Sequence, residues 1–258
     1  MRKLLFTLCC ISSLHAIYTG NPASPALLNK GLFGAQSYLI TVATGYIYDN
    51  VWNARIYRKN DPEASSIEKL EDCAIYSNWA SLSFIFLRRL ELYGYFGVSK
   101  ESIDWTAKIP RTDTELKTRN HFSYSLGGKA IMLQFGGTVL SLDFQYFIMP
   151  TSNKFLQKVV NIYMPLELSS QNLDTKEWQL ALGLATKLGP LCPYIGGKYS
   201  QLKINIKSED LPTLLLQNKW PWGLFLGGSL SLSHSFYVNG EVRFFDEDAY
   251  SIAITTAF

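Results

Sequence analysis

Tyr250-Ser-Ile-Ala-Ile-Thr-Thr-Ala-Phe258 alternates between large apolar residues and small or polar ones. Successive side chains of an extended chain point to opposite faces, so one face carries Tyr250, Ile252, Ile254 and Phe258. The other face carries Ala249, Ser251, Ala253, Thr255 and Ala257. Such a two-faced strand is typical of a barrel wall between lipid and a polar interior. The stretch therefore predicts an outer-membrane β-strand that ends on an aromatic residue, with an edge strand of a soluble sandwich as the alternative.

The opposite end of the chain has the pattern of a secretory signal peptide. Met1-Arg2-Lys3 is basic, residues 4–14 are mostly apolar, and Ala16 is a small residue suited to a cleavage site. The apolar run is too short for a spanning helix, which needs about 20 residues. Cys9 and Cys10 raise the alternative of a lipoprotein, but the residues before Cys9 are not small. We predict a signal peptide over residues 1–16 and a barrel over residues 17–258.

Composition supports export to a membrane and argues against nucleic acid. The chain has 24 Lys plus Arg and 21 Asp plus Glu, and removal of Arg2 and Lys3 leaves 22 against 21. Nucleic-acid binding requires clustered excess positive charge, so we expect no nucleic-acid partner. Hydrophobic residues make up 47% and charged residues only 17%, yet no apolar run is long enough to span a bilayer as a helix. An exported apolar chain of this kind can cross a membrane only as a closed barrel, because lipid leaves no partner for unpaired backbone groups.

Alternation recurs through the rest of the chain. It is clearest at residues 139–148, 178–185, 222–233 and 236–244. Phe225 is an exception to the pattern in the third of these stretches. Other candidate strands cover residues 37–49, 74–87, 89–98, 120–135, 155–168 and 193–207. Gly127-Gly128, Gly136-Gly137 and Ser233 to Ser235 are candidate tight turns, and His234 is expected in the last of them. Polar loops are expected at residues 58–72, 99–118, 169–175 and 208–219. At about 10 residues per strand, the chain supports an antiparallel barrel of about 12 strands, within a range of 10 to 16.

The polar positions of these strands are candidates for the lining of a pore. A charged residue in the middle of a membrane strand has to face the lumen, and this criterion selects Asp143, Gln145, Asn239, Glu241 and Arg243. Barrels of this size fall between those filled by side chains and those with an aqueous channel. The five residues could therefore line a narrow channel or form a hydrogen-bonded plug.

Several stretches, in order along the chain, resemble the chlamydial major outer membrane porin family. The longest is Lys176-Glu-Trp-Gln-Leu-Ala-Leu-Gly-Leu-Ala-Thr-Lys-Leu188, continued by Cys192-Pro-Tyr-Ile-Gly-Gly-Lys-Tyr-Ser200. Gly20-Asn-Pro-Ala-Ser-Pro25 is similar to the mature start of that family. Further similar stretches lie at residues 44–51, 89–98 and 242–248, whereas residues 99–172 match only in pattern. The resemblance covers the predicted barrel from beginning to end.

The resemblance implies a general-diffusion porin that also stiffens the envelope through disulfides. This chain is shorter than the family and cysteine-poor, since its predicted mature part has only Cys73 and Cys192. In an oxidising periplasm these two thiols could form one intramolecular bridge, form intermolecular bridges or remain free. Extensive cross-linking is not expected. Cys73 is expected in or beside a polar loop, and Cys192 at a turn.

Two other classes of function are alternatives to a porin. His121 and Ser123 share one strand face, as in an outer-membrane lipid hydrolase, but no acid or amide is placed to orient the imidazole. We predict no enzyme, no catalytic residues, no metal site and no cofactor. A structural or surface-exposed barrel without a conducting pore is the second alternative.

The expected partners follow from a porin-like barrel in the outer membrane. They are outer-membrane lipids, small hydrophilic solutes or ions, and the barrel-assembly machinery, which would engage the strand carrying Tyr250, Ile252, Ile254 and Phe258. A homo-oligomer is compatible with the sequence but not required by it.

Overall fold

The computed structural model describes residues 19–24, 40–51, 54–58, 68–87, 89–108, 111–152, 155–159, 172–207, 213–233 and 235–258. Almost all of these residues lie in antiparallel strands, and the predicted antiparallel β-barrel is confirmed. Within the same residues no helix has the length and apolar character to cross a bilayer. The predicted signal peptide, residues 1–16, lies outside the described residues and stays a prediction.

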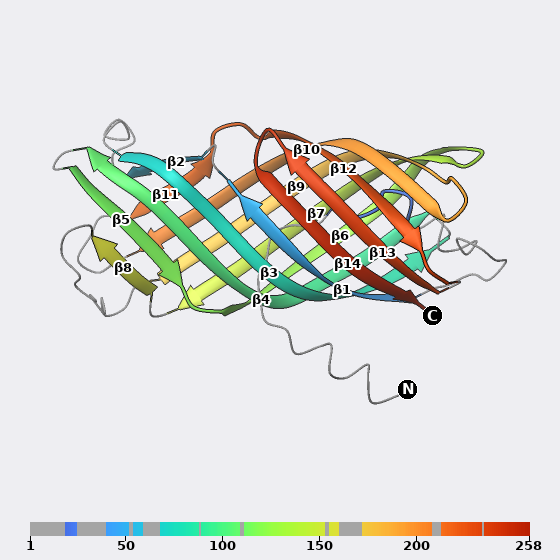
Figure 1. Ribbon diagram of the computed structural model, residues 1–258, viewed down its shortest axis with the longest axis horizontal. Helices are drawn as coiled ribbons and strands as arrows, with labels where there is room; N and C mark the ends of the chain where they lie inside the picture. Colours follow the sequence, from blue (N-terminus) through green and yellow to red (C-terminus); the bar gives the residue numbers. More distant parts are fainter. Residues whose placement is uncertain are drawn as a thin grey trace, which may run out of the picture.

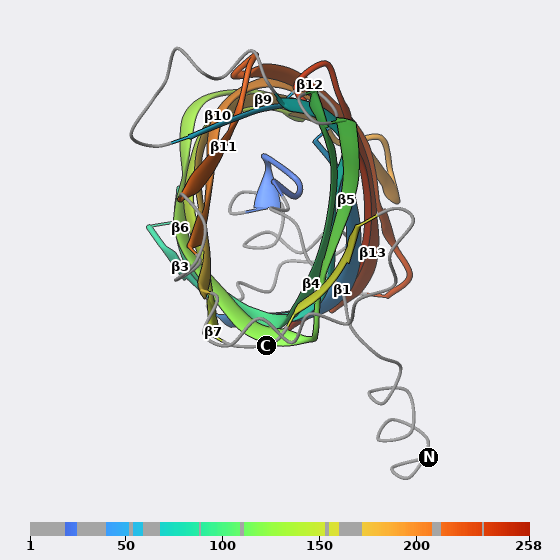
Figure 2. The ribbon, with the colours of Figure 1, turned by 90° about the vertical axis from the view of Figure 1, so that its left-hand side faces the viewer.

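Ten of the described strands form a closed ring, seen end-on in Figure 2. The ring closes where β10 (Leu191–Lys207) pairs with β12 (Trp222–Ser231), from Leu191↔Leu230 to Tyr199↔Trp222. Ten lies at the lower limit of the predicted range. The ring strands are β1 (Ile40–Asn50), β3 (Glu68–Phe86), β4 (Leu90–Lys108), β6 (His121–Phe135), β7 (Thr138–Ser152), β9 (Asn172–Thr186), β10 (Leu191–Lys207), β12 (Trp222–Ser231), β13 (Phe236–Phe244) and β14 (Asp248–Ala257).

Four further strands lengthen the wall at one end, which we call the extended end. They are β2 (Ala54–Arg58), β5 (Arg111–Thr118), β8 (Phe155–Val159) and β11 (Leu214–Asn218). Strand β5 pairs with the last part of β4 and with β8, whereas β11 joins the last part of β10 to β2. Strands β3 and β4 have 19 residues each. A tilted strand crosses a bilayer in about 9–11 residues, so these strands continue well beyond it.

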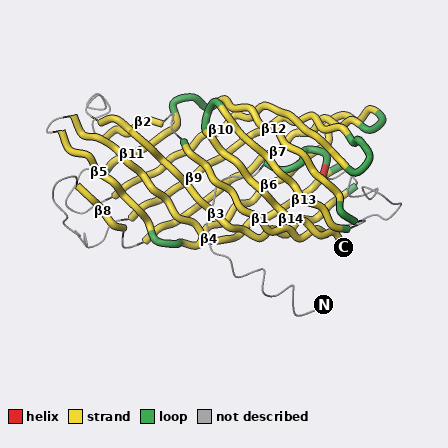
Figure 3. The backbone as a smooth tube through the Cα atoms, in the orientation of Figure 1, coloured by secondary structure: helices red, strands yellow, loops and turns green. Residues whose placement is uncertain are grey.

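The other end carries short connections, and we call it the turn end. Gly136 and Gly137 join β6 to β7, and Gly136 has a φ of 56°, which favours glycine. The C-terminal strand also ends here, where the amide of Phe258 donates to the carbonyl of Ile40 at 2.9 Å (Figures 1 and 3). Short turns face the periplasm in barrels of this type, so we expect the extended end to lie outside the cell.

The predicted alternation is confirmed in β14. Tyr250, Ile252 and Phe258 are at least half exposed, whereas Ala253 and Ser251 are buried against the interior. Phe225, the exception in the sequence pattern, also follows the strand geometry. It points inward and is fully buried next to Tyr194.

Five predicted loop or turn assignments are wrong in whole or in part. Gly127-Gly128 is not a reversal but lies inside β6, and a Cβ on Gly127 would lie 2.4 Å from the Tyr93 ring. Glycine is needed there for the close approach of that ring. The stretch 99–118, expected as a loop, consists mainly of the end of β4 and of β5. The predicted polar loops at 58–72, 169–175 and 208–219 likewise overlap β3, β9 and β11, and residues 59–67 and 208–212 lie outside the described residues.

The reason for the wrong loop prediction is that the wall reverses its polarity toward the extended end. In the ring, β10 places Ile195 and Tyr199 outward and Lys198 and Ser200 inward. Beyond Ser200 the same strand places Leu202, Ile204 and Ile206 inward and Lys203 and Lys207 outward. The ring therefore has the polarity of a membrane barrel, and the extended end has that of a water-soluble β-protein with an apolar core. A polar outer face made these strands resemble loops in the sequence.

Candidate functional site: the barrel interior

All five predicted lumen residues point into the barrel. Asp143, Gln145, Asn239, Glu241 and Arg243 are each 3% exposed or less. Asp143 accepts a hydrogen bond from Tyr93, and Gln145 donates to the Ser125 hydroxyl at 2.8 Å. Asn239 donates to the Thr255 hydroxyl at 3.2 Å. These side chains are therefore held by hydrogen bonds to inward-facing residues of nearby strands.

A network of charges lies inside the ring at the ends of β13 and β1, beside the turn that joins β13 to β14. Arg243 Nη1 lies 2.9 Å from Glu247 and Nε lies 3.7 Å from Glu241, while Asp49 is 4.0 Å from Nη2. Lys198 Nζ lies 2.9 Å from Asp246 and also pairs with Glu247. All these side chains are at most 3% exposed. Breaking one buried pair leaves an uncompensated charge and costs about 3–5 kcal/mol, so the network holds its members in place.

Acidic groups outnumber basic groups in this network. Glu177 also points inward, which gives five carboxylates, those of Asp49, Glu177, Glu241, Asp246 and Glu247, against Lys198 and Arg243. Burial acts to raise the pKa of Glu247, in the turn between β13 and β14, but the charges of Arg243 and Lys198 outweigh it and lower that pKa. Acidic side chains therefore outnumber basic ones at this level of the interior. In the described part of the chain no His, Cys, Asp or Glu cluster is arranged to hold a metal ion.

Sequence reasoning identified Glu241 and Arg243 but missed Lys198, Asp49 and Glu177. All three are charged residues within ring strands. The criterion that selected Asp143, namely that a charge within a membrane strand faces the lumen, would therefore have selected them too. Asp246 and Glu247 follow β13 in a turn, where sequence offers no such signal.

Residues 19–24 lie inside the ring as a plug, visible in Figure 2 as the blue segment. The amides of Gly20 and Thr19 donate to the Glu241 carboxylate at 3.1 Å and 3.4 Å. Lys129 Nζ donates to the carbonyls of Thr19 and Asn21, both at 3.1 Å. The Asn21 side chain donates to the Ser229 hydroxyl at 2.8 Å. The plug is thus attached to β6, β12 and β13 by hydrogen bonds, two of whose partners are charged.

Steric fit also positions the plug. Pro22 packs against Gly183 of β9, and a Cβ built on Gly183 would lie 2.3 Å from Pro22 Cγ. The glycine therefore provides the seat for the proline. Between the plug and the wall there is a cavity of about 40 Å³, lined in part by Gly20, Asn21, Trp79 and Tyr93.

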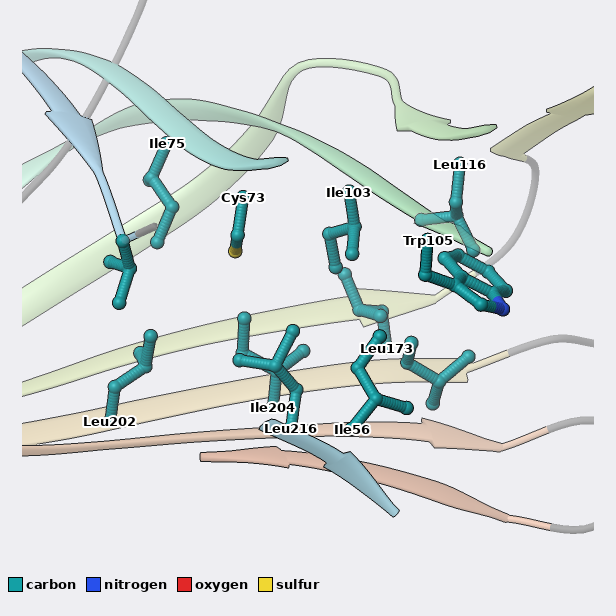
Figure 4. Close-up of a cluster of buried hydrophobic side chains, with 12 residues drawn as sticks. Ile56, Cys73, Ile75, Ile103, Trp105, Leu116, Leu173, Leu202, Ile204 and Leu216 are labelled. Atoms are coloured by element: carbon teal, nitrogen blue, oxygen red, sulfur yellow. The ribbon is translucent and has the colours of Figure 1, made fainter. Parts of the chain in front are cut away.

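The extended end is closed by a cluster of buried apolar side chains, which we call the apolar cap (Figure 4). Ile75 and Ile103 come from β3 and β4, and Ile204 and Leu216 come from β10 and β11 on the facing wall. The complete set is Val51, Ile56, Cys73, Ile75, Ile103, Trp105, Leu116, Leu173, Leu202, Ile204, Ile206 and Leu216. Facing walls that pack in this way close the barrel with aliphatic side chains.

Both described cysteines are free and lie in different clusters. Cys73 is inside strand β3 and fully buried in the apolar cap, not in a loop. Cys192 is buried near the turn end beside Tyr194 and Phe225. In this conformation neither thiol is bridged.

The arrangement of His121 and Ser123 does not support a hydrolase. Ser123 is fully buried and points into the interior, and its hydroxyl has no hydrogen-bond partner. An activated serine nucleophile needs a hydrogen bond to its base. His234 lies outside the described residues.

Comparison with known proteins connects this barrel to porins. The chain is similar to the major outer membrane porin, serovar H, of Chlamydia trachomatis, with 23% identity over an alignment of 301 positions covering 80% of this chain and 76% of the relative. It is also similar to a major outer membrane porin of Chlamydia pneumoniae, with 26% identity, 88% of this chain and 81% of the relative. No protein-family model matches the chain.

The resemblance seen in the sequence is thus confirmed. With the closed barrel, it places the protein in the outer membrane as a porin-like barrel. Among solved structures, the outer membrane protein OprG from Pseudomonas aeruginosa aligns with a TM-score of 0.46 and 10% identity over 86% of this chain and 96% of that one. The outer membrane protease OmpT from Escherichia coli aligns with a TM-score of 0.43 and 8% identity over 85% and 95%.

Proposed function

We propose that this protein is a diffusion channel of the outer membrane for small hydrophilic solutes or ions. The observation that carries the proposal is the polar, charged interior of a closed ring whose outside is apolar. Similarity to proteins named major outer membrane porins supports it. Asp143, Gln145, Asn239, Glu241 and Arg243 would then line the path, and the excess of carboxylates would favour cations.

In the conformation described here the path is closed at two levels. The plug fills the ring, and the apolar cap fills the extended end. Hydrogen bonds and packing hold the plug against the wall. We propose that conduction requires the plug to leave its seat and the facing walls of the cap to separate.

The closed interior also favours a second candidate, a structural envelope barrel without a pore. An aliphatic constriction excludes water and ions, so a cap that never opens would seal the barrel. Neither candidate is an enzyme. The assembly machinery acting on the strand that carries Tyr250, Ile252, Ile254 and Phe258, and a homo-oligomer, remain part of the proposal.

Single-channel recording in planar bilayers separates these candidates. Three refolded proteins are compared: the natural sequence, Gly183→Val, which removes the seat of Pro22, and Ile204→Ser with Leu216→Ser, which makes the cap polar. Folding of each protein is verified by heat-modifiable gel migration. Stepwise openings that become more frequent in the variants support the channel. Silence of all three folded proteins would refute it and leave the sealed barrel.

Substitutions that remove a charge test whether Glu241 and Asp143 line the conduction path. Glu241→Gln and Asp143→Asn are each expected to lower the preference for cations over anions, measured as a shift in reversal potential. Unchanged reversal potentials in both variants of a conducting barrel would remove these residues from the path.

A further inference from the structure

The outer surface of the extended end is basic above one part of the ring. Arg55, Lys203, Lys207 and Lys219 are exposed, and Lys176 lies beside Lys203. The registers Lys176↔Lys203, Lys203↔Gln217 and Gln217↔Arg55 place Lys176, Lys203 and Arg55 in one row across β9, β10, β11 and β2. Neighbouring strands lie about 4.8 Å apart, so Lys203 and Arg55 are about 10 Å apart along the row. Lys176 pairs with Asp174 at 2.8 Å, which leaves Arg55 and Lys203 as the main cations of the row.

Aromatic residues lie directly below this row, toward the ring. Trp178 is two residues from Lys176, and its indole donates to the Gln201 side chain at 3.1 Å. The Tyr199 ring lies between Trp178 and Trp222, with centroid distances of 5.3 Å and 5.0 Å. Trp and Tyr at this level are typical of the boundary between lipid and water.

A groove follows below the aromatic residues on the lipid-facing side. It has a volume of about 760 Å³ and is lined by Leu142, Leu180, Leu182, Leu224 and Gly197, with Tyr199, Trp222 and Phe245 at its upper part. A Cβ on Gly197 would meet its nearest atom at 3.8 Å, so packing of the wall does not require a glycine there. The missing side chain instead leaves a hollow. Phe245, at a φ of 84° that is uncommon for a bulky residue, extends beside it and is 62% exposed.

We propose that this face is a specific binding site for a phosphate-bearing lipid of the outer leaflet. Its phosphate would lie on Arg55 and Lys203, and an acyl chain would occupy the groove over Gly197. The spacing suits such a molecule, because six residues along β10 separate Lys203 from Gly197. That is about 20 Å along a tilted strand and about 15 Å in depth.

Charge complementarity distinguishes this face from the face formed by β3, β4 and β5. On the other side of the extended end, β3, β4 and β5 place Glu71, Asp72, Asp104 and Glu115 in the corresponding region, together with Lys100 and Lys117. An anionic headgroup is therefore attracted to the β9–β10–β11–β2 face and not to the β3–β4–β5 face. The proposal depends on residence in the outer membrane and not on conduction.

Native mass spectrometry of the refolded protein in neutral detergent, titrated with diphosphoryl lipid A, tests the site. Arg55→Gln with Lys203→Gln is expected to weaken lipid binding about fivefold for each lost charge (about 1 kcal/mol). Gly197→Phe, which fills the hollow, is expected to weaken binding at least tenfold. Folding of every variant is verified by heat-modifiable migration.

Matched controls remove the same charge or add the same ring elsewhere. Lys100→Gln with Lys117→Gln changes the opposite face, and Gly240→Phe adds an aromatic ring on β13 where nothing lies within 4 Å of a Cβ. Both are expected to bind lipid A within twofold of the natural sequence. Site variants that bind like their controls would overturn the proposal. The proposal would also be overturned if the charge variants weakened lipid binding while Gly197→Phe did not. Displacement of the lipid by millimolar inorganic phosphate would overturn it as well.

Discussion

The plug offers a perturbation whose effect can be worked out from distances, namely Gly183→Ala. The added Cβ would lie 2.3 Å from Pro22 Cγ and 2.8 Å from Pro22 Cβ, and ordinary contact begins at 3.4 Å. The rigid proline ring would have to move by about 1.1 Å, the difference between 2.3 Å and 3.4 Å. A shift of this size carries the bonds from Gly20 to Glu241, from Lys129 to Asn21 and from Asn21 to Ser229 beyond hydrogen-bond range.

Two of these bonds involve a charged group and one is neutral. At about 1.5 kcal/mol for each charge-assisted bond and about 1 kcal/mol for the neutral one, the plug loses about 4 kcal/mol. Since 1.4 kcal/mol corresponds to a factor of ten, the released state becomes about a thousandfold more populated relative to the seated state.

Hydrogen–deuterium exchange of the peptide spanning residues 19–24 measures this change without requiring the apolar cap to open. The amides of Thr19 and Gly20 donate to the Glu241 carboxylate of the wall, whereas those of Ala23 and Ser24 donate to Asn21 within the plug itself. In Gly183→Ala the amides of Thr19 and Gly20 are expected to exchange up to about a thousandfold faster. Gly94→Ala is the control, because its Cβ would meet Leu126 Cδ2 at 3.4 Å and the Ser125 carbonyl oxygen at 3.8 Å, both at ordinary contact distance. Equal protection of residues 19–24 in the natural sequence and in Gly183→Ala would refute the steric argument for the seat.

Three further predictions concern other parts of the barrel. Ile204→Ala in the apolar cap is expected to lower the free energy of unfolding by about 2–5 kcal/mol, measured by denaturant titration, and Lys203→Ala, on the outer face of the same strand, by much less. Glu247 has a lowered pKa, so its contribution to stability is present above its ordinary pKa of 4.5 and is lost as the pH falls through the lowered value. Glu247→Gln should therefore reduce thermal stability at pH 7 and flatten its dependence on pH below 4.5, and an unchanged acid profile would contradict the assignment. Phe258→Ser is expected to reduce the yield of heat-modifiable barrel in the outer membrane, whereas Thr256→Ser, two residues earlier on the same face, should leave the yield unchanged.

The sequence predicted the parts of this fold in which one physical rule applies. The terminal strand from Tyr250 to Phe258 has lipid on one side along its whole length, so alternation alone assigned both faces. The inward direction of Asp143, Glu241 and Arg243 was predicted because a charge in a membrane strand can face only inward.

Where the surroundings of a strand change, the same reasoning failed. In β4, Phe96 and Val98 face outward, but Ile103 and Trp105 face inward. The apolar residues of β4 thus move from even to odd positions, while the strand itself continues without interruption. The polar residues on the outer face of this last part were mistaken for a loop. The plug could not be predicted, because the contacts of Gly20 and Asn21 are with residues more than a hundred positions away.

The reversal of polarity along β10 also determines how deep the molecule sits. Sliding the barrel toward the periplasm would carry Lys203 and Arg55 into hydrocarbon, at up to about 2–4 kcal/mol each near the midplane. Sliding it outward would expose Leu182, Ile195 and their neighbours to water. The change in polarity along the strands therefore sets the depth of the barrel in the membrane.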